Sequence, residues 1–188
     1  IIRNSGVEHD AMERLCVRVA GLVHDIGHGP FSHTLEEILQ GVGADFHHED
    51  MTVRFIEEEE SSVSSILREI DPELPLRVSR YIDATKRTEE RWEYRLVSSQ
   101  LDADRLDYVL RDELYTGIRG HGFDLHRLLD LLYHWDGKNI AVEKGDLEAV
   151  EAYLVTLNHL YRAIYYHHAV RAANFMLSST LKRAVALS

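Results

Sequence analysis

The sequence lacks several features that would by themselves define a class of protein. Its 188 residues contain a single cysteine, Cys16, so no disulfide can form within the chain. Because disulfides belong to oxidising compartments, this favours a reducing, cytoplasmic location. No apolar run reaches the roughly 18 residues that a membrane-spanning helix requires, so no membrane partner is expected.

Positive charge is also scarce. The chain has 21 Lys and Arg residues against 32 Asp and Glu residues, which gives a net charge of -11. Nucleic acid and anionic membranes need a basic surface, so neither is an expected partner. A small anionic substrate stays open, because a metal or a few arginines can reverse the local charge. The 12 histidines direct attention to metal ligands.

Prolines number only three, and apolar residues recur at three-and-four spacing, which predicts helices. Helices are expected over 12–26, from about 32 to 41, from about 48 into the glutamates 57–60, over 76–84 and from 98. A further helical stretch is expected from about 146 to 181, as one long helix or two abutting ones.

A β-hairpin turn is predicted at Asp136–Gly137, between strands at Leu128–Tyr133 and Asn139–Val142. We therefore expect an all-α helical bundle with one small β-hairpin near residues 131–142, in a single domain over residues 1–188.

The first chemical motif is His24–Asp25, which ends an apolar helix and is followed by His28 and His33 around two glycines and a proline. An adjacent imidazole and carboxylate suit divalent Mn, Fe, Ni, Co or Zn if the helix end turns both side chains to one side. In the plainer alternative, the histidine only bonds a carbonyl at the helix end.

The second motif is Asp104, Tyr108 and Asp112, which lie at i, i+4 and i+8 and so share one helical face. Two carboxylates and a phenol in one stripe can offer a metal ligand and contacts to a sugar. The alternative is an exposed face of ordinary ion pairs, such as Asp107 with Arg111.

Together these motifs resemble a known family. The strings VHDIGHGPFSHTLEE, HHED and SSQLDADRLDYVLRDELYTG are similar to the HD-domain phosphohydrolases, and more narrowly to their deoxynucleoside triphosphate triphosphohydrolase (dNTPase) branch. The hairpin and the residues 161–167 resemble that branch as well. The resemblance implies an all-α HD-domain fold.

The resemblance also implies a divalent metal (Mn, Fe, Ni, Co, Zn or Mg) held by His24, Asp25 and Asp104, whose ligand atoms are expected roughly 2.0–2.3 Å from it. The family has a further metal-binding histidine well upstream, in an Arg-aromatic-Glu-His-Ser segment that nothing here matches. The chain is therefore expected either to lack an N-terminal portion or to be a truncated member. Its metal is expected to be weakly held or absent, because one ligand is lacking.

Other roles follow from the resemblance. The family places histidines near the α-phosphate, and His28, His33 and the pair His48–Glu49 match them. Glu49, or Glu36 from the preceding helix, is expected to orient His48 as an acid or base. The positions that match substrate contacts are Arg105, Tyr108, Asp112 and Tyr165, although Arg105 can equally pair with a surface carboxylate.

The leading hypothesis is metal-dependent hydrolysis of a deoxynucleoside triphosphate to a deoxynucleoside and inorganic triphosphate. One alternative keeps the metal and changes the substrate to a nucleoside monophosphate or a phosphodiester. Another is a nucleotide-binding or assembly domain without turnover. The resemblance further implies a small-molecule nucleotide as partner and assembly into a homo-oligomer.

Overall fold

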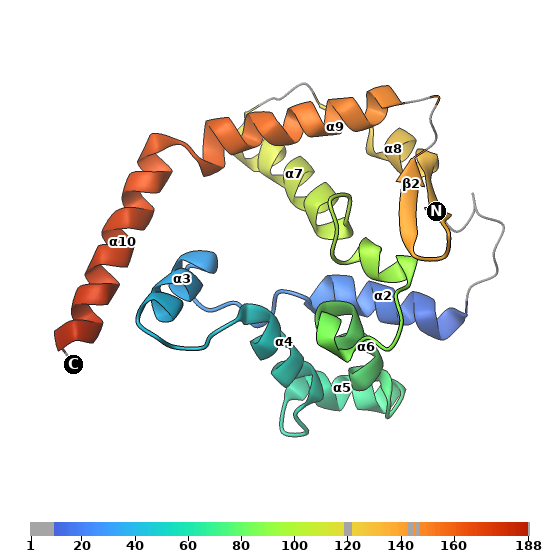
Figure 1. Ribbon diagram of the computed structural model, residues 1–188, viewed down its shortest axis with the longest axis horizontal. Helices are drawn as coiled ribbons and strands as arrows, with labels where there is room; N and C mark the ends of the chain where they lie inside the picture. The colour runs from blue at the N-terminus through green and yellow to red at the C-terminus, as the bar shows by residue number, and fades with distance from the viewer. Residues whose placement is uncertain (1–9, 119–121, 143–144, 146, 188) are drawn as a thin grey trace. The chain divides into compact units, whose positions relative to one another are not determined.

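The computed structural model describes residues 10–118, 122–142, 145 and 147–187, which are mostly helical (Figure 1). The expected all-α fold with one small β-hairpin is confirmed. Two compact units are present. We call Arg18–Arg87 with His168–Ser188 the histidine unit, and Ile1–Val17 with Thr88–His167 the tyrosine unit. Helix α2 (Ala11–Val23) contains the boundary between them in sequence.

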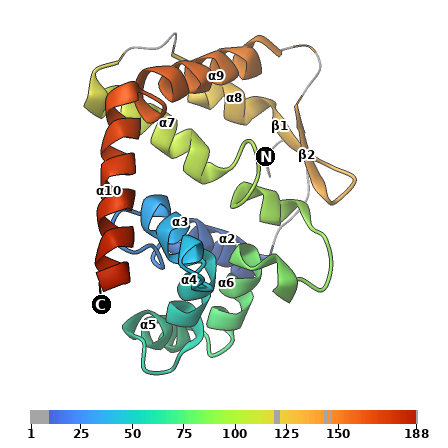
Figure 2. The same cartoon turned by 60° about the vertical axis from the view of Figure 1, so that its left-hand side comes forward.

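The histidine unit is built on three short helices, α4, α5 and α6, that pack on one another, while α10 packs on α3 (Figure 2). Helix α6 buries Leu74, Val78, Tyr81 and Ile82 at i, i+4, i+7 and i+8, which is the spacing of one helical face. The elements are α3 (His33–Gly41), α4 (His48–Glu57), α5 (Ser62–Ile70), α6 (Leu74–Ile82), the 3₁₀ turn η1 (Ala84–Lys86) and α10 (His168–Leu187).

The tyrosine unit has its core where α7 and α8 meet α9. Helix α9 buries Ala149, Tyr153, Thr156 and Leu160, again on one face. The Tyr153 hydroxyl donates to the Gln100 carbonyl at 3.1 Å, so this buried phenol is satisfied. The elements are η2 (Trp92–Leu96), α7 (Ala103–Thr116), α8 (Leu125–Leu131), β1 (Leu132–Trp135), β2 (Asn139–Val142), α9 (Leu147–Leu160) and the π-helical segment η4 (Tyr161–Tyr165).

The predicted hairpin forms around Asp136–Gly137, where both residues have positive φ, 53° and 72°. Strands β1 and β2 are antiparallel, with Trp135 opposite Asn139. The prediction of a strand over Leu128–Tyr133 is wrong for its first four residues, because the residues up to Leu131 belong to α8. The Asp124 side chain caps that helix by accepting from the Arg127 amide at 3.0 Å.

Two predicted helix starts are also corrected. The helix expected from Ser98 begins at Ala103, because the Asp102 carboxylate accepts both the Ser99 and the Arg105 amides and so fixes a cap. The helix expected after Pro75 begins at Leu74 instead. Proline is tolerated in a first helical turn, since its missing N–H would have no partner there.

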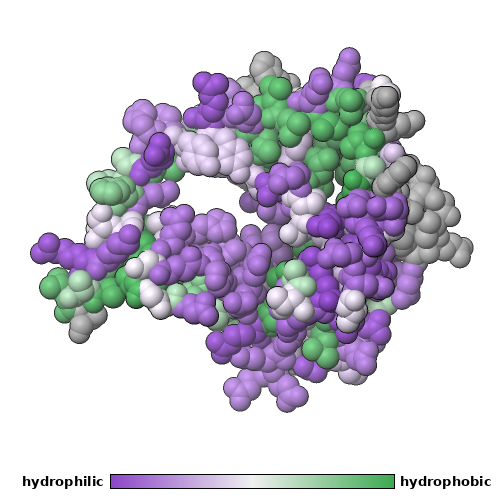
Figure 3. Space-filling view, in the orientation of Figure 1, coloured by the Kyte–Doolittle hydropathy of each residue, from purple (hydrophilic) through white to green (hydrophobic). Residues whose placement is uncertain are grey.

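One apolar patch lies over α8 and α9 on the face that Figure 3 draws. The exposed hydrophobic residues of these helices are Leu129, Leu147, Leu154 and Val155. Such a patch suits contact with another chain. Among the residues that the structure describes, no helix is both long and apolar enough to cross a bilayer.

Replacing Asp102 by alanine should destabilise the protein by about 1–3 kcal/mol, because its buried carboxylate accepts two backbone amides at once. Urea unfolding measures the loss. Asp124→Ala is the matched control, since its exposed cap on the shorter α8 should cost about 0.5–1 kcal/mol. Equal losses of stability in Asp102→Ala and Asp124→Ala would show that burial of the cap adds nothing.

Candidate active site

The His24–Asp25 pair lies in the turn that follows α2. The Nδ1 atom of His24 is hydrogen-bonded to the Gly21 carbonyl at 3.0 Å, as the plainer alternative predicted. The same kind of bond fixes the ring of a metal-ligating histidine. The Nε2 atom lies 3.4 Å from Oδ1 of Asp25, within the roughly 3.0–3.5 Å that separates two ligands of one ion. The pair therefore fits a divalent metal.

Asp104, the third expected ligand, is in the first turn of α7 and belongs to the tyrosine unit. Its convergence with His24 and Asp25 stays a prediction.

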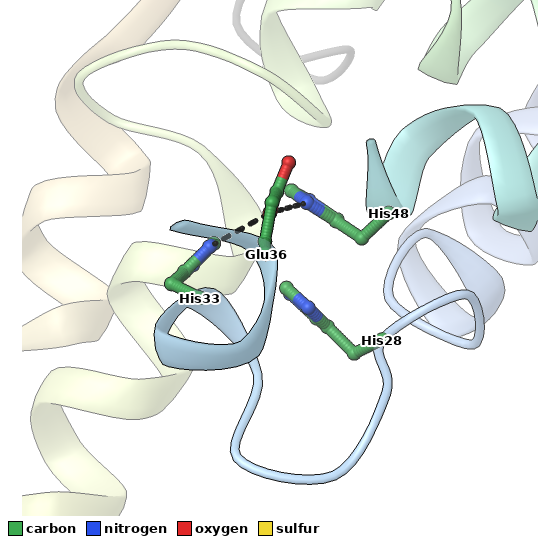
Figure 4. Close-up of side chains that lie close together, drawn as sticks. All are labelled: His28, His33, Glu36 and His48. Carbon is green, nitrogen blue, oxygen red and sulfur yellow. Dashed lines mark hydrogen bonds and ion pairs between the residues drawn. The ribbon is translucent and has the colours of Figure 1, made fainter. Parts of the chain in front are cut away.

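Three histidines gather around one carboxylate in the histidine unit (Figure 4). His28 comes from the loop after the His24–Asp25 turn, His33 and Glu36 from the start of α3, and His48 from the first residue of α4. The Glu36 Oε2 atom lies 2.8 Å from Nδ1 of His48 and 3.5 Å from Nδ1 of His33. The four residues each offer one ligand-type atom within 4.8 Å of the others. They form what we call the histidine cluster.

The rings of the histidine cluster also contact one another. His28 stacks on His48 with centroids 3.9 Å apart and planes at 11°. His33 meets both rings edge-on, at 4.7 Å from His28 and 5.2 Å from His48. Nδ1 of His28 is buried without a hydrogen-bond partner among the described residues. A buried polar atom of this kind commonly marks a place for water or a bound group.

The charges of the cluster are set by burial and by neighbours. Burial and the adjacent His48 lower the pKa of His28, against the opposing effect of Asp25. This favours a neutral ring at pH 7. Burial on its own would raise the pKa of Glu36, but its hydrogen bonds with His48 and His33 outweigh that and hold the pKa below its ordinary value. Glu36 is therefore an ionised carboxylate whose side chain is only 12% exposed.

The carboxylate that orients His48 is Glu36 and not Glu49, which is exposed on the first turn of α4. The sequence held a signal for this: Glu36 follows His33 by three residues, so both side chains lie on one face of α3. Glu36 also lies close to His47, whose Nδ1 is 3.4 Å from the Glu36 Oε1 atom. The catalytic role assigned to Glu49 stays a prediction.

A second group of expected residues meets in the tyrosine unit. The Tyr165 hydroxyl, from η4, donates to Oδ2 of Asp112 on α7 at 2.5 Å. Tyr108, one turn before Asp112, is hydrogen-bonded to Tyr161, a residue that sequence reasoning did not select. Burial raises the pKa of Tyr108 and that of Tyr165, and the hydrogen bonds to Tyr161 and Asp112 add to this effect. Tyr108 and Tyr165 therefore remain protonated donors at neutral pH.

Arg105 is held at the start of α7. Its Nε donates to the Ser99 carbonyl at 2.9 Å and lies 3.4 Å from Oδ2 of Asp102. Arg105 thus pairs with a carboxylate, but this is the buried Asp102 and not a surface group. Contact of Arg105 with a phosphate stays a prediction. The alternative reading of α7, an exposed face of ordinary ion pairs, is confirmed in part, because Asp107 and Arg111 form an ion pair at 2.6 Å.

Comparison with protein families gives two matches. The HD domain matches residues 2–112, which contain the His24–Asp25 turn, the histidine cluster and the Asp104–Asp112 stripe. The HD associated region matches residues 123–188, which contain the hairpin and Tyr165.

Individual relatives of the chain are consistent with the match to the HD domain. The chain is 37% identical over 179 residues to YwfO of Bacillus subtilis, an uncharacterized protein, covering 94% of this chain and 39% of that one. It is 31% identical to a deoxynucleoside triphosphate triphosphohydrolase SAMHD1 homolog of Dictyostelium discoideum, covering 92% of this chain and 34% of the relative. A phosphohydrolase structure from Bacteroides thetaiotaomicron matches with a TM-score of 0.77 and 33% identity, over 95% of this chain and 41% of that chain. The chain thus spans about two fifths of these proteins or less.

Replacing Glu36 by glutamine should destabilise the protein by about 1–3 kcal/mol at pH 7, because the ionised hydrogen-bond partner of His48 is lost. The folded state lowers the pKa of Glu36, so its carboxylate stabilises the fold above pH 4.5 and loses this effect as the pH falls through the folded value. The difference between wild type and Glu36→Gln should therefore shrink on acidification.

Urea unfolding at pH 7, 5.5 and 3 measures this difference. Glu37→Gln, at an exposed carboxylate on the same helix, is the control and should change little at any pH. A constant difference for Glu36→Gln from pH 7 to pH 3 would show that its carboxylate is not held by the histidines.

Proposed function

The chain belongs to the HD-domain family, and from this premise we propose that it is a metal-dependent phosphohydrolase that cleaves deoxynucleoside triphosphates to deoxynucleoside and inorganic triphosphate. Its resemblance to the dNTPase branch supports this substrate. The observation that carries the proposal is the histidine cluster: three histidines share one ionised carboxylate beside the His24–Asp25 turn. Metal binding alone would not require such a cluster.

The metal would be held by His24, Asp25 and Asp104, and when bound it would lower the pKa of water and neutralise phosphoryl charge. Its identity among Mn, Fe, Ni, Co, Zn and Mg is open. The spacing of the His24 and Asp25 ligand atoms supports this assignment.

The histidine cluster supplies the proton chemistry in this proposal. Glu36 holds Nδ1 of His48 by a 2.8 Å hydrogen bond, which fixes the ring and presents its other nitrogen to an acid–base partner. His33 has a side chain that is 71% exposed, so it can reach a leaving oxygen and donate a proton to it. His28 is neutral, and its buried Nδ1 has no hydrogen-bond partner in the described part of the chain, so it is suited to a hydrogen bond with a phosphate oxygen or its water.

The tyrosine unit supplies the sugar contacts. Asp112 accepts the Tyr165 hydroxyl and retains capacity for a further donor, because a carboxylate can accept about four hydrogen bonds. Tyr108 stands one turn earlier on the same face of α7. In this proposal a hydroxyl-bearing sugar along this face is held by Tyr108, Asp112 and Tyr165, and Arg105 contacts the phosphate.

Three further expectations stay predictions. Glu49 is an additional acid–base candidate, the protein assembles into a homo-oligomer, and its location is cytoplasmic.

Product analysis tests the substrate. The intact natural protein should release inorganic triphosphate from at least one dNTP when a divalent metal is present. Ion chromatography separates triphosphate from pyrophosphate and orthophosphate. Release of either smaller product would favour another nucleotide hydrolase. Absence of turnover with metal bound would favour the nucleotide-binding domain.

Replacing His48 by alanine should lower kcat by roughly 10²–10⁴, the usual effect of removing an acid–base group, while the protein stays folded. Steady-state kinetics with the preferred dNTP measures the loss, and circular dichroism checks the fold. His126→Ala is the control, because this exposed histidine lies on α8, outside the cluster. Activity of the His48→Ala protein at the wild-type level would remove His48 from the mechanism.

A further inference from the structure

A single buried hydroxyl joins the His24–Asp25 turn to the helix that begins with His48. Thr52 lies on α4, four residues after His48, and is completely buried. Its Oγ1 donates to the His24 carbonyl at 2.8 Å and accepts the Gly27 amide at 2.9 Å. A threonine hydroxyl has one proton to give and lone pairs to accept with, so both bonds form at once. The turn that carries the metal-ligand pair is therefore bonded at both of its ends to one side chain.

Gly27 lets the turn come this close. A Cβ atom at position 27 would lie 2.2 Å from the His48 carbonyl oxygen and 2.3 Å from the Thr52 amide nitrogen. Both neighbours are backbone atoms of α4, so no side-chain movement could make room. The turn is thus packed directly against the first turn of α4, where His48 begins the helix.

We propose that Thr52 is a positioning residue that locks the His24–Asp25 turn onto α4 and so fixes the metal-ligand pair relative to His48. The proposal rests on the proposed function, because it takes His24 and Asp25 as metal ligands and His48 as an acid–base group. Thr52 acts through them.

The chemistry explains why one hydroxyl has this effect. The His24 carbonyl belongs to the same peptide unit as the Asp25 amide, so a bond to that carbonyl restrains the backbone between the two ligands. The Gly27 amide restrains the chain just before His28, which stacks on His48. Groups that orient metal ligands from behind commonly change metal affinity by 10–100-fold when they are removed.

Metal affinity separates positioning from general stability. Thr52→Val keeps the shape of the side chain and removes both hydrogen bonds, whereas Thr52→Ser keeps the hydroxyl. The dissociation constant for Mn²⁺, measured on the folded intact protein by isothermal titration calorimetry, should rise about 10–100-fold in Thr52→Val and stay within about threefold of wild type in Thr52→Ser.

Ser79→Ala is the matched control. Ser79 is equally buried in the same unit, and its hydroxyl donates to the Leu76 carbonyl on α6, away from the turn. This variant should lose stability and keep the wild-type Mn²⁺ affinity. Unchanged affinity in Thr52→Val, or an equal loss in Ser79→Ala, overturns the proposal.

A second measurement does not depend on the variant folding. In the wild-type protein the Gly27 amide should be strongly protected from hydrogen exchange, because it donates to a buried oxygen. Exchange of that amide at the rate of an unstructured peptide would overturn the proposal. Wild-type protein that binds Mn²⁺ but hydrolyses no dNTP would contradict the proposed substrate alone, while wild-type protein that binds no Mn²⁺ would overturn both the ligand assignment and the role of Thr52.

Discussion

The charge of Glu36 is the constraint on which the histidine cluster depends. Three imidazoles whose rings lie within 5.2 Å of one another would repel each other if protonated and would lack a fixed orientation if neutral. A carboxylate at 2.8 Å from one and 3.5 Å from another supplies both the opposite charge and the hydrogen bonds. Burial makes this carboxylate costly to ionise, and the histidines offset that cost. The cluster and its carboxylate therefore stabilise each other.

Local sequence signals predicted most of the fold because the chain uses them without conflict. Asp136–Gly137 forms the expected turn, and the apolar spacing of α9 forms the expected buried face. The errors occurred where a side chain competed with the periodic pattern. The Asp102 carboxylate accepts two amides in a cap, so α7 begins later than expected. Asp124 begins a helix in a leucine-rich run that was predicted as the strand before the hairpin turn.

The sequence was sufficient to select the histidines of the site, but it did not show which side chains contact one another. His28, His33 and His48 come together as the motif implied, yet the carboxylate that joins them was placed second after the adjacent Glu49. Sequence neighbours on a helix point about 100° apart, so Glu49 cannot face its own neighbour's ring easily. Thr52 gave no motif signal, and Tyr161 lay in the resembling segment 161–167 without being singled out. The contacts of both residues arise from tertiary packing over 25 or more residues.

The π-helical winding of η4 decides which side of the chain Tyr165 presents. The Tyr166 amide bonds the Tyr161 carbonyl, five residues back, so this turn takes in one residue more than an α turn does. Under α winding, a residue five positions after Leu160 would lie about 140° around the axis from it. The wider turn brings Tyr165 back toward the buried face of Leu160, where it packs against the core and meets Asp112. The contact with Asp112 is therefore a matter of helical phase: a chain one residue shorter in this segment could keep every tyrosine and still lose it.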